Sequence, residues 1–317
     1  MTITQLRYVL AVAEHKNFTK AAEKVFVTQP TLSMQIQKLE EELEVQIFDR
    51  TKKPIDLTET GRLIVEQARN IVNESDRIQD IVDQQKGFIG GLFRLAIIPT
   101  VMPTLLPMFL KNFTTKYPKV KLKIEELHTE AMIEKLHDGH LDAGIAATPL
   151  GQPEVVERPL YYEPFVGYIP YNHRLSNKKQ IETSDLEIDD MLLLEDGHCF
   201  KEGVLNICKS KRSVEEDQFQ LESGSFETLT KLANEGLGMT LLPYLHTLEI
   251  KDSEKDHLRM FAEPVPAREV SLIYNRSELK MQIINALHST ISGAVRGAIA
   301  FQNVKIVSPL GPKKSRL

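Results

Sequence analysis

Two cysteines, Cys199 and Cys208, are the residues of this sequence best suited to reversible covalent chemistry. They are the only cysteines in the chain, and eight residues separate them. A reducing compartment keeps such thiols unpaired, so a disulfide between them should form only on oxidation and should not be a permanent structural bond. His198 directly precedes Cys199 and adds a group that can exchange a proton or bind a metal. The pattern leaves open redox chemistry, a metal site and two inert core thiols.

The residues around Cys199 predict a thiol that ionises readily. An apolar stretch runs up to Leu194, the acidic turn 195–197 follows, and a short helix is expected from about Phe200. The N-terminal dipole of that helix would favour a thiolate at Cys199. If residues 200–208 are helical, the Cα atoms of the two cysteines lie about 13 Å apart, well beyond the roughly 7 Å that a disulfide spans. Joining the cysteines would therefore require this segment to refold.

A zinc site made of Cys199, Cys208 and His198 is disfavoured by the spacing of these residues. Neither cysteine belongs to a C-x-x-C pair, and adjacent His and Cys side chains are awkward ligands for one tetrahedral ion. We therefore expect neither a metal nor a cofactor.

The composition is that of an ordinary globular protein of two or three folded units. The chain has 317 residues, of which 42% are hydrophobic and 26% are charged. Its formal net charge is −5, so any binding of nucleic acid must depend on a local basic face. The N-terminus lacks the pattern of a signal peptide, and no run of 18 apolar residues occurs. We expect a cytoplasmic protein that does not enter membranes.

The N-terminal residues predict a helix-turn-helix. Helical periodicity indicates helices over 3–14 and 19–25, and a third helix begins near Gln29, where Thr28 can cap it and Pro30 suits its first turn. A tight turn joins the second and third helices. Gln, Thr and Ser side chains near the start of the third helix could contact base edges in a major groove.

A long helix is expected from about Glu59 to Gln85, with Thr58 as its cap. It carries a single apolar stripe, which is better buried against a second copy of the chain than left in water. The sequence therefore predicts at least a dimer.

The remaining two hundred residues alternate between strand and helix patterns, which is typical of an α/β domain. The alternation begins with a strand at 92–98, and a second run from 165 to 265 is expected to form another lobe. Residues 268–275 should return the chain to the first lobe, and a cleft would lie between the lobes. Residues 302–317 look like a tail with little to bury.

A family resemblance supports this division. The stretch FTKAAEKVFVTQPTLSMQIQKLEEELEVQIFDR resembles the signature of LysR-type transcription regulators, with A-A, Q-P-T-L-S, I-x-x-L-E-x-x-L and I-F-x-R in succession. The resemblance, which extends over about residues 1–300, implies a winged helix-turn-helix at 1–58, a linker and dimerisation helix at 59–88, a regulatory domain of the periplasmic-binding-protein type at 92–301, and a tail at 302–317. Within the regulatory domain it implies lobe I at about 92–162 and 267–301, and lobe II at about 163–266. It places the following residues at the DNA: Thr28, Gln29, Pro30, Thr31, Ser33 and Gln35 in the recognition helix, and Arg50, Lys52 and Lys53 in the wing.

The segment LLLEDGHC, which ends at Cys199, is similar to the sensor motif of the peroxide-responsive members of this family. The resemblance implies that hydrogen peroxide oxidises Cys199 to a sulfenic acid, and that Cys208 resolves it to a disulfide. The disulfide would switch the conformation of an oligomer and activate promoters of antioxidant genes. Four residues are implied as support for peroxide at the sulfur: Thr100, Thr129, His198 and Arg268.

The same resemblance implies the partners. They are double-stranded promoter DNA, further copies of the chain in a dimer of dimers, RNA polymerase, hydrogen peroxide and a cellular thiol reductant. No enzyme activity is expected.

Three alternatives remain at this point. A LysR-type regulator could respond to a small metabolite in the cleft between the lobes, with both cysteines incidental. A thiol peroxidase would use the same sulfenic chemistry, but the helix-turn-helix speaks against it. A solute-binding protein would share the two lobes but not the ninety N-terminal residues.

Overall fold

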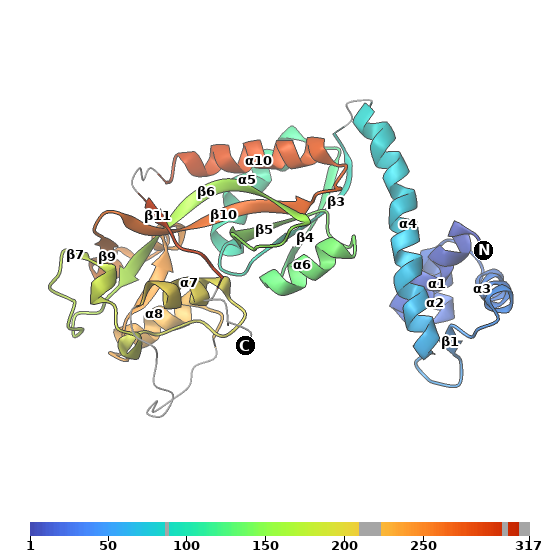
Figure 1. Cartoon of the computed structure of the whole chain (residues 1–317), viewed down its shortest axis with the longest axis horizontal. Helices are drawn as coiled ribbons and strands as arrows, with labels where there is room; N and C mark the ends of the chain where they lie inside the picture. Colours follow the sequence, from blue (N-terminus) through green and yellow to red (C-terminus); the bar gives the residue numbers. More distant parts are fainter. Residues whose placement is uncertain (86–88, 209–222, 300–303, 311–317) are drawn as a thin grey trace. The chain divides into compact units, whose positions relative to one another are not determined.

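The computed structural model describes residues 1–85, 89–208, 223–299 and 304–310, and the chain divides into two compact units between residues 88 and 89 (Figure 1). The N-terminal unit contains α1 (Ile3–His15), α2 (Phe18–Lys24), α3 (Gln29–Leu43), β1 (Phe48–Asp49), β2 (Asp56–Leu57) and α4 (Glu59–Gln85).

Side-chain caps set the beginning of each short helix. Thr2 caps α1, Asn17 caps α2 through two backbone N–H groups, and Thr28 caps α3 by accepting a hydrogen bond from the backbone of Thr31. These caps satisfy N–H groups that have no partner inside the helix. α3 begins at Gln29, with a proline in its first turn, as the sequence predicted. The helix-turn-helix is therefore confirmed.

The wing is a two-stranded antiparallel hairpin in which Phe48 pairs with Leu57. Glu40, near the end of α3, is buried, and its Oε1 accepts the backbone N–H groups of Ile47 at 2.8 Å and Phe48 at 3.2 Å. This carboxylate fixes where the chain leaves α3 and enters the wing, since a buried carboxylate needs such partners.

α4 spans the length expected for the linker helix and has two different apolar sides. Val65, Ala68 and Val72 are buried in the core of the N-terminal unit. Leu63 and Ile78 are instead 66% and 65% exposed. Among the described residues, no helix or strand packs against this second side of α4.

The C-terminal unit is built on one mixed sheet. Its strands are β3 (Gly91–Ile97), β4 (Val120–Glu126), β5 (Ala143–Thr148), β6 (Val155–Tyr168), β7 (Gln180–Ile181), β8 (Thr240–Pro243), β9 (Leu258–Phe261), β10 (Val265–Asn275) and β11 (Val304–Ile306). Its helices are α5 (Met102–Lys116), α6 (Thr129–His137), α7 (Cys199–Ile207), α8 (Phe226–Asn234), α9 (Tyr244–Thr247) and α10 (Met281–Arg296), with 3₁₀ turns at Thr183–Asp185, Ile188–Asp190 and Asp252–His257.

The strand order is β4-β3-β5-β10-β6-β9-β7, with β8 also paired to β6 and β11 to β10. The first three strands are parallel, whereas β10 runs antiparallel to both β5 and β6. α5 and α10 pack against each other over the first part of the sheet (Figure 1).

Two hydrophobic cores give this unit its two lobes. Phe93, Phe109 and Leu287 belong to the first core, while Phe165 and Leu241 belong to the second. The long strands β6 and β10 run through both cores, so residues in the middle of these strands lie at the passage between the lobes. The two-lobed α/β architecture is confirmed, and the lobe boundaries drawn from the sequence stay a prediction.

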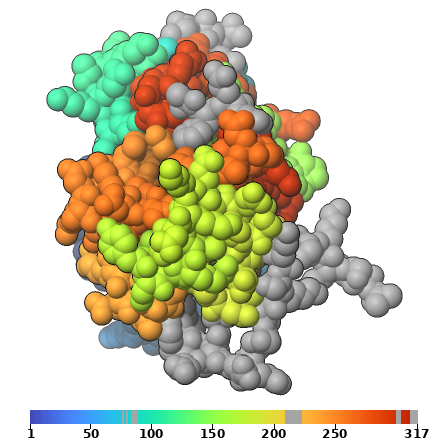
Figure 2. Space-filling model, turned by 90° about the vertical axis from the view of Figure 1, so that its left-hand side faces the viewer, coloured from blue at the N-terminus to red at the C-terminus, as the bar shows by residue number. Residues whose placement is uncertain are grey.

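The second lobe is assembled from segments far apart in the sequence. Its surface shows yellow-green segments around residues 165–200 beside orange segments around residues 240–275 (Figure 2). In the part of the chain that the structure describes, no helix is long and apolar enough to span a membrane.

The prediction that residues after 302 have little to bury is wrong for residues 304–310. β11 pairs in parallel with the start of β10, and the backbone N–H of Val307 donates to Ala267 at 2.8 Å. Val304 and Val307 pack against the second core. Farther along, the Nδ2 group of Asn206 in α7 donates to the carbonyls of Ser308 at 2.9 Å and Leu310 at 3.0 Å. Residues 265–267 of β10 lie beyond its pairing with β5, which begins at Glu269, so β11 can pair with them there, and a sequence pattern does not reveal this.

Candidate functional site

Cys199 is the first residue of α7, and His198 is the residue before the helix. The thiol is partly buried, and burial raises its pKa above the ordinary value. The positive charge of Arg268, the hydroxyl of Thr129 and a backbone hydrogen bond from Ala147 act in the opposite direction. The expectation of a favoured thiolate is therefore wrong for this conformation, because desolvation of the sulfur outweighs the helix dipole and the nearby charge.

A buried ion pair lies beside this sulfur. Arg268 of β10 is 3% exposed and Glu163, its neighbour across the sheet on β6, is 1% exposed. Glu163 Oε2 accepts from Arg268 Nε at 2.9 Å and from Nη2 at 2.7 Å, while its Oε1 accepts the backbone N–H of Leu245 at 3.0 Å. Arg268 Nη1 donates to Thr100 Oγ1 at 2.8 Å, and Nη2 donates to the Thr100 carbonyl at 3.0 Å. The pair holds the loop after β3 against β6 and β10.

Arg268 keeps its charge despite burial. Burial alone would lower the pKa of Arg268, but the charge of Glu163, followed by Tyr161 and Cys199, raises it. Its guanidinium also lies over the ring of Phe200, 5.1 Å from the centroid, which is a cation–π contact. Cys199 thus faces a permanent positive charge that becomes its counter-charge when the thiol ionises.

The hydroxyl of Thr129 lies beside the sulfur of Cys199. Thr129 is the first residue of α6, and its Oγ1 is buried with no hydrogen-bond partner among the described residues. It lies close enough to Cys199 to favour the thiolate. A buried hydroxyl without a partner is costly, so a small polar molecule at the sulfur would gain a hydrogen bond here.

His198 lies on the other side of the turn, between two further polar side chains. It is 4% exposed, and its Nε2 is 3.5 Å from Glu195 Oε1 without forming a hydrogen bond. Its ring meets that of His128 edge-on, with centroids 4.6 Å apart. Burial, and then His128, lower the pKa of His198, while Glu195 opposes this. The side chain is therefore a neutral imidazole near pH 7.

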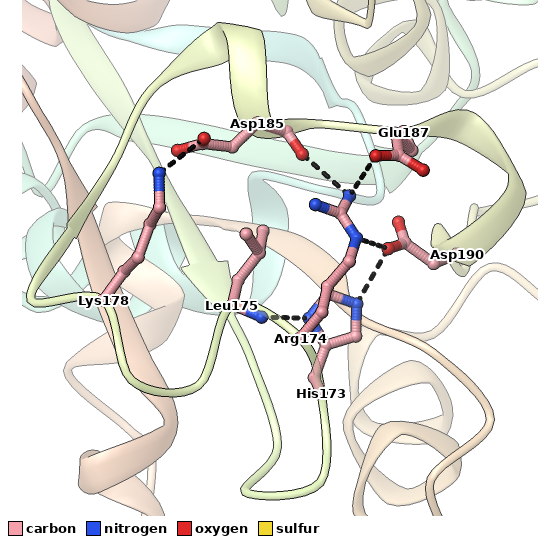
Figure 3. Close-up of polar contacts among 7 residues, drawn as sticks. All are labelled: His173, Arg174, Leu175, Lys178, Asp185, Glu187 and Asp190. Carbon is pink, nitrogen blue, oxygen red and sulfur yellow. Dashed lines mark hydrogen bonds and ion pairs between the residues drawn. The ribbon is translucent and has the colours of Figure 1, made fainter.

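Cys208 follows the last residue of α7, at the opposite end of the helix from Cys199. Burial, together with the negative charge of Asp190, raises the pKa of Cys208 to about 11. Asp190 is held in place by His173 Nε2 and Arg174 Nε, both of which lie 2.9 Å from its Oδ2 (Figure 3). Cys208 is thus a neutral thiol packed against the second core.

The two cysteines cannot form a bond in this conformation. The two Cα atoms are nine residue steps apart along α7, which corresponds to about 13 Å, and a disulfide requires at most roughly 7 Å. Both are free thiols. The same separation excludes a metal site that uses both cysteines and His198 while α7 is intact.

The residues expected at DNA form two exposed groups in the N-terminal unit. Thr28, Gln29, Pro30 and Thr31 are exposed at the start of α3, and Ser33 is half-buried. The hydroxyls of Thr28 and Thr31 lie 2.8 Å apart. They form a polar end of the helix that is suited to phosphate and base contacts.

Three other members of the set have contacts within the unit. Gln35 is half-buried and accepts a long hydrogen bond, 3.4 Å, from Gln5 of α1. Arg50 donates to the buried Glu40 at 2.8 Å and lies over the ring of Phe18. Lys52 is near Asp49 and Asp56 at 4.0 and 3.7 Å. Lys53 is exposed. Arg50 is thus a structural residue of the wing, and its contact with DNA stays a prediction.

Sequence reasoning missed three residues of the site: Glu163, His128 and Glu195. Glu163 could have been suspected, because a carboxylate interrupts the otherwise apolar stretch from Leu160 to Tyr168. His128 gave no such signal, since its proximity to His198 depends on how α6 meets the turn before α7.

Comparisons with known proteins agree with this architecture. Residues 3–62 match the bacterial regulatory helix-turn-helix model of the lysR family, and residues 86–295 match the LysR substrate binding domain. A hydrogen peroxide-inducible genes activator from Pectobacterium carotovorum subsp. carotovorum is 34% identical over 86% of this chain and 90% of its own length. The DNA-binding transcriptional dual regulator OxyR of Escherichia coli K12 is also 34% identical, over 86% and 89%.

Solved structures show the same similarity. A full-length OxyR variant from Pseudomonas aeruginosa has a TM-score of 0.74 at 33% identity and covers 92% of this chain and 94% of its own. A hydrogen peroxide-bound OxyR mutant from Corynebacterium glutamicum has a TM-score of 0.63 at 27% identity and covers 96% and 98%.

Proposed function

Because the chain belongs to the LysR family of bacterial transcription regulators, we propose that it is a DNA-binding regulator that senses hydrogen peroxide through Cys199 and Cys208. One observation carries the proposal: the buried cation Arg268 and the hydroxyl of Thr129 both act on the Cys199 thiol, at the N-terminus of a helix that is followed directly by the second thiol.

The first chemical step is attack of the Cys199 thiolate on one oxygen of hydrogen peroxide. The O–O bond breaks, an S–O bond forms, and hydroxide leaves, so that sulfur is oxidised to sulfenic acid and peroxide is reduced. We propose that Arg268 stabilises the thiolate and that the hydroxyls of Thr129 and Thr100 and the ring of His198 bind the peroxide oxygens. The raised pKa of Cys199 keeps most of the sulfur protonated, so reaction draws on a small thiolate population.

The second step joins the cysteines. The thiol of Cys208 attacks the sulfenic sulfur of Cys199, the S–O bond breaks, and water leaves as the disulfide forms. Because an intact α7 keeps the two residues apart, the bond selects a refolded segment between them. A cellular thiol reductant then supplies two electrons and two protons, which convert the Cys199–Cys208 disulfide back to two thiols while the reductant is itself oxidised to a disulfide.

The refolded segment links this chemistry to transcription. α7 packs on the second core through Phe200, Val204 and Ile207, so its rearrangement changes the surface of lobe II. We propose that the change alters contacts within a dimer of dimers, and thereby how pairs of helix-turn-helix units meet promoter DNA and RNA polymerase. The apolar side of α4 at Leu63 and Ile78 supports self-association. We expect the regulated promoters to be those of antioxidant genes and the protein to act in the cytoplasm.

The test compares wild type with Cys208→Ser after treatment with a slight excess of hydrogen peroxide, using mass spectrometry of the thiols. We expect a Cys199–Cys208 disulfide in wild type and a trapped Cys199 sulfenic acid in the variant. Two unreacted thiols in wild type would refute peroxide sensing and favour a regulator that responds to a metabolite in the cleft. Rapid steady-state consumption of peroxide would instead indicate a peroxidase.

A further inference from the structure

Three side chains with metal-binding atoms converge beside the sensor turn. His128, Glu195 and His198 each offer one ligand atom, and these atoms all lie within 4.8 Å of one another. His128 precedes α6, whereas Glu195 and His198 belong to the turn that leads into α7. The cluster therefore joins two segments that are about seventy residues apart in the chain.

One of these atoms is buried and has no hydrogen-bond partner among the residues that the structure describes. It is His198 Nε2: the side chain is 4% exposed, and Glu195 Oε1 lies 3.5 Å away, beyond a good hydrogen bond. A buried polar atom without a hydrogen bond destabilises a folded protein, and such atoms commonly bind a water molecule or an ion. Imidazole is the commonest side-chain ligand of metal ions in proteins.

The orientation of His128 fits the same role. Its Nδ1 lies 3.2 Å from the carbonyl oxygen of Gly197. A carbonyl accepts hydrogen bonds and cannot donate them, so Nδ1 carries the proton and Nε2 has the free lone pair. Histidines that bind metals commonly donate their second ring N–H to a backbone carbonyl in this way.

Gly224 leaves space at the ligand atoms. A Cβ at this position would lie 3.0 Å from His198 Nε2 and 3.1 Å from Glu195 Oε1, closer than ordinary contact permits. The neighbouring Ser223 fixes this backbone, because its carbonyl accepts the N–H of Glu195 at 3.0 Å. The absence of a side chain thus keeps a small cradle open beside two of the three ligands.

We propose that His128, Glu195 and His198 bind one divalent transition-metal ion of the Zn²⁺ type. Two imidazoles and one carboxylate are a donor set suited to Zn²⁺, and not to Ca²⁺ or Mg²⁺, which require mostly oxygen ligands. Water would fill the fourth position of a tetrahedral ion. The three ligand atoms need to move together by less than 2 Å, since ligands of one tetrahedral zinc ion lie roughly 3.3 Å apart at bond lengths near 2 Å.

A metal here would regulate the sensor, a consequence that rests on the proposed function. The ion would tie the start of α6 to the turn that begins α7, directly before Cys199. Formation of the disulfide requires this turn and α7 to rearrange, so the metal would slow it and stabilise the reduced form. By linkage, oxidation would weaken metal binding by the same factor.

Metal binding is tested with the full-length protein in a Cys199→Ser/Cys208→Ser background, which removes thiols as competing ligands. Titration calorimetry with Zn²⁺ should show one ion per chain, and His128→Gln and Glu195→Gln should each weaken binding by at least about 100-fold. His137→Gln is the matched control, because His137 also lies beside a carboxylate, 3.2 Å from Glu154, and this pair belongs to no group of three ligands among the described residues. It should bind Zn²⁺ like the parent. Absence of binding in the parent, or unchanged binding in both ligand variants, would overturn the proposal.

The regulatory consequence is tested separately in the protein with both cysteines. We expect Zn²⁺ to slow formation of the Cys199–Cys208 disulfide by hydrogen peroxide in wild type and to have no such effect in His128→Gln. An equal rate with and without Zn²⁺ in a protein that binds the ion would refute the coupling. If no disulfide forms even without Zn²⁺, the proposed peroxide function itself fails, whatever the calorimetry shows.

Discussion

Glu163→Gln exchanges the carboxylate that binds Arg268 for a neutral amide of nearly the same shape. Arg268 stays charged and loses the negative charge of the carboxylate that accepts two of its N–H groups at 2.7 and 2.9 Å. Cys199 already interacts with this guanidinium, and its thiolate would become a more important counter-charge. We therefore expect the variant to be less stable and its Cys199 pKa to be lower than in wild type.

The size of each effect follows from the burial of the pair. Removal of one partner of a buried ion pair costs about 3–5 kcal/mol, and the amide still accepts hydrogen bonds, so we expect a loss of about 3 kcal/mol in the free energy of unfolding. Stabilisation of the thiolate by ~1.4 kcal/mol corresponds to a tenfold larger thiolate population. The rate of sulfenic acid formation near pH 7 should therefore rise by up to about tenfold, although the free energy of unfolding falls.

Urea unfolding of the reduced proteins measures the first effect, and stopped-flow oxidation by hydrogen peroxide at several pH values measures the second. Glu157→Gln serves as the control, because Glu157 lies on the same strand and its carboxylate accepts the N–H of Leu150 at 2.8 Å. It should lower stability without changing the pH profile of oxidation. An unchanged or raised Cys199 pKa in Glu163→Gln would refute the view that Arg268 tunes the sulfur.

Four further predictions address other parts of the molecule. The folded-state pKa of Cys208 is about 11, above the unfolded value near 8.5, so its neutral thiol contributes stability that is present below about pH 8.5 and lost as pH rises through 11. Because the thiol is partly exposed, the loss should be about 1 kcal/mol and absent in Cys208→Ser, as measured by urea unfolding of reduced protein. Asn206→Ala removes two hydrogen bonds between α7 and the 308–310 segment, and should speed disulfide formation a few-fold in a gel-shift assay with peroxide, whereas an unchanged rate would show that this segment does not restrain α7. Phe26 is 95% exposed with φ at +58°, so Phe26→Asn should stabilise the N-terminal unit by about 1 kcal/mol in thermal unfolding; a destabilised variant would contradict this account of strain. Ile78→Glu places a charge on the uncovered side of α4 and should reduce self-association in analytical ultracentrifugation, and an unaltered oligomer would exclude this side as an interface.

The sequence predicted elements well where local chemistry decides them. α3 begins at Gln29 because Thr28 caps it, and α4 spans Glu59–Gln85 as its helical periodicity indicated, although its apolar residues lie on two sides rather than in one stripe. α7 begins at Cys199 rather than Phe200, because His198 already has extended backbone angles. Caps and periodicity act over a few residues and can be read directly from the chain.

The candidate site was predictable only in part, since it is made of contacts between distant segments. The pairing of Arg268 with Glu163 depends on the register of β10 against β6, and the meeting of His128 with His198 depends on how two helix starts approach. The helix dipole at Cys199 was visible in the sequence, but the burial that outweighs it was not. Burial is a property of the whole fold.

Peroxide chemistry at Cys199 should refold α7, and amide hydrogen exchange before and after stoichiometric hydrogen peroxide measures that refolding. In the reduced protein the backbone N–H of Cys208 donates to Val204 at 3.2 Å, and the amides toward the end of α7 should be protected. Oxidation should remove this protection in wild type but not in Cys208→Ser, while β10 stays protected in both. A protein that forms the Cys199–Cys208 disulfide and still protects the amides of α7 would contradict the account.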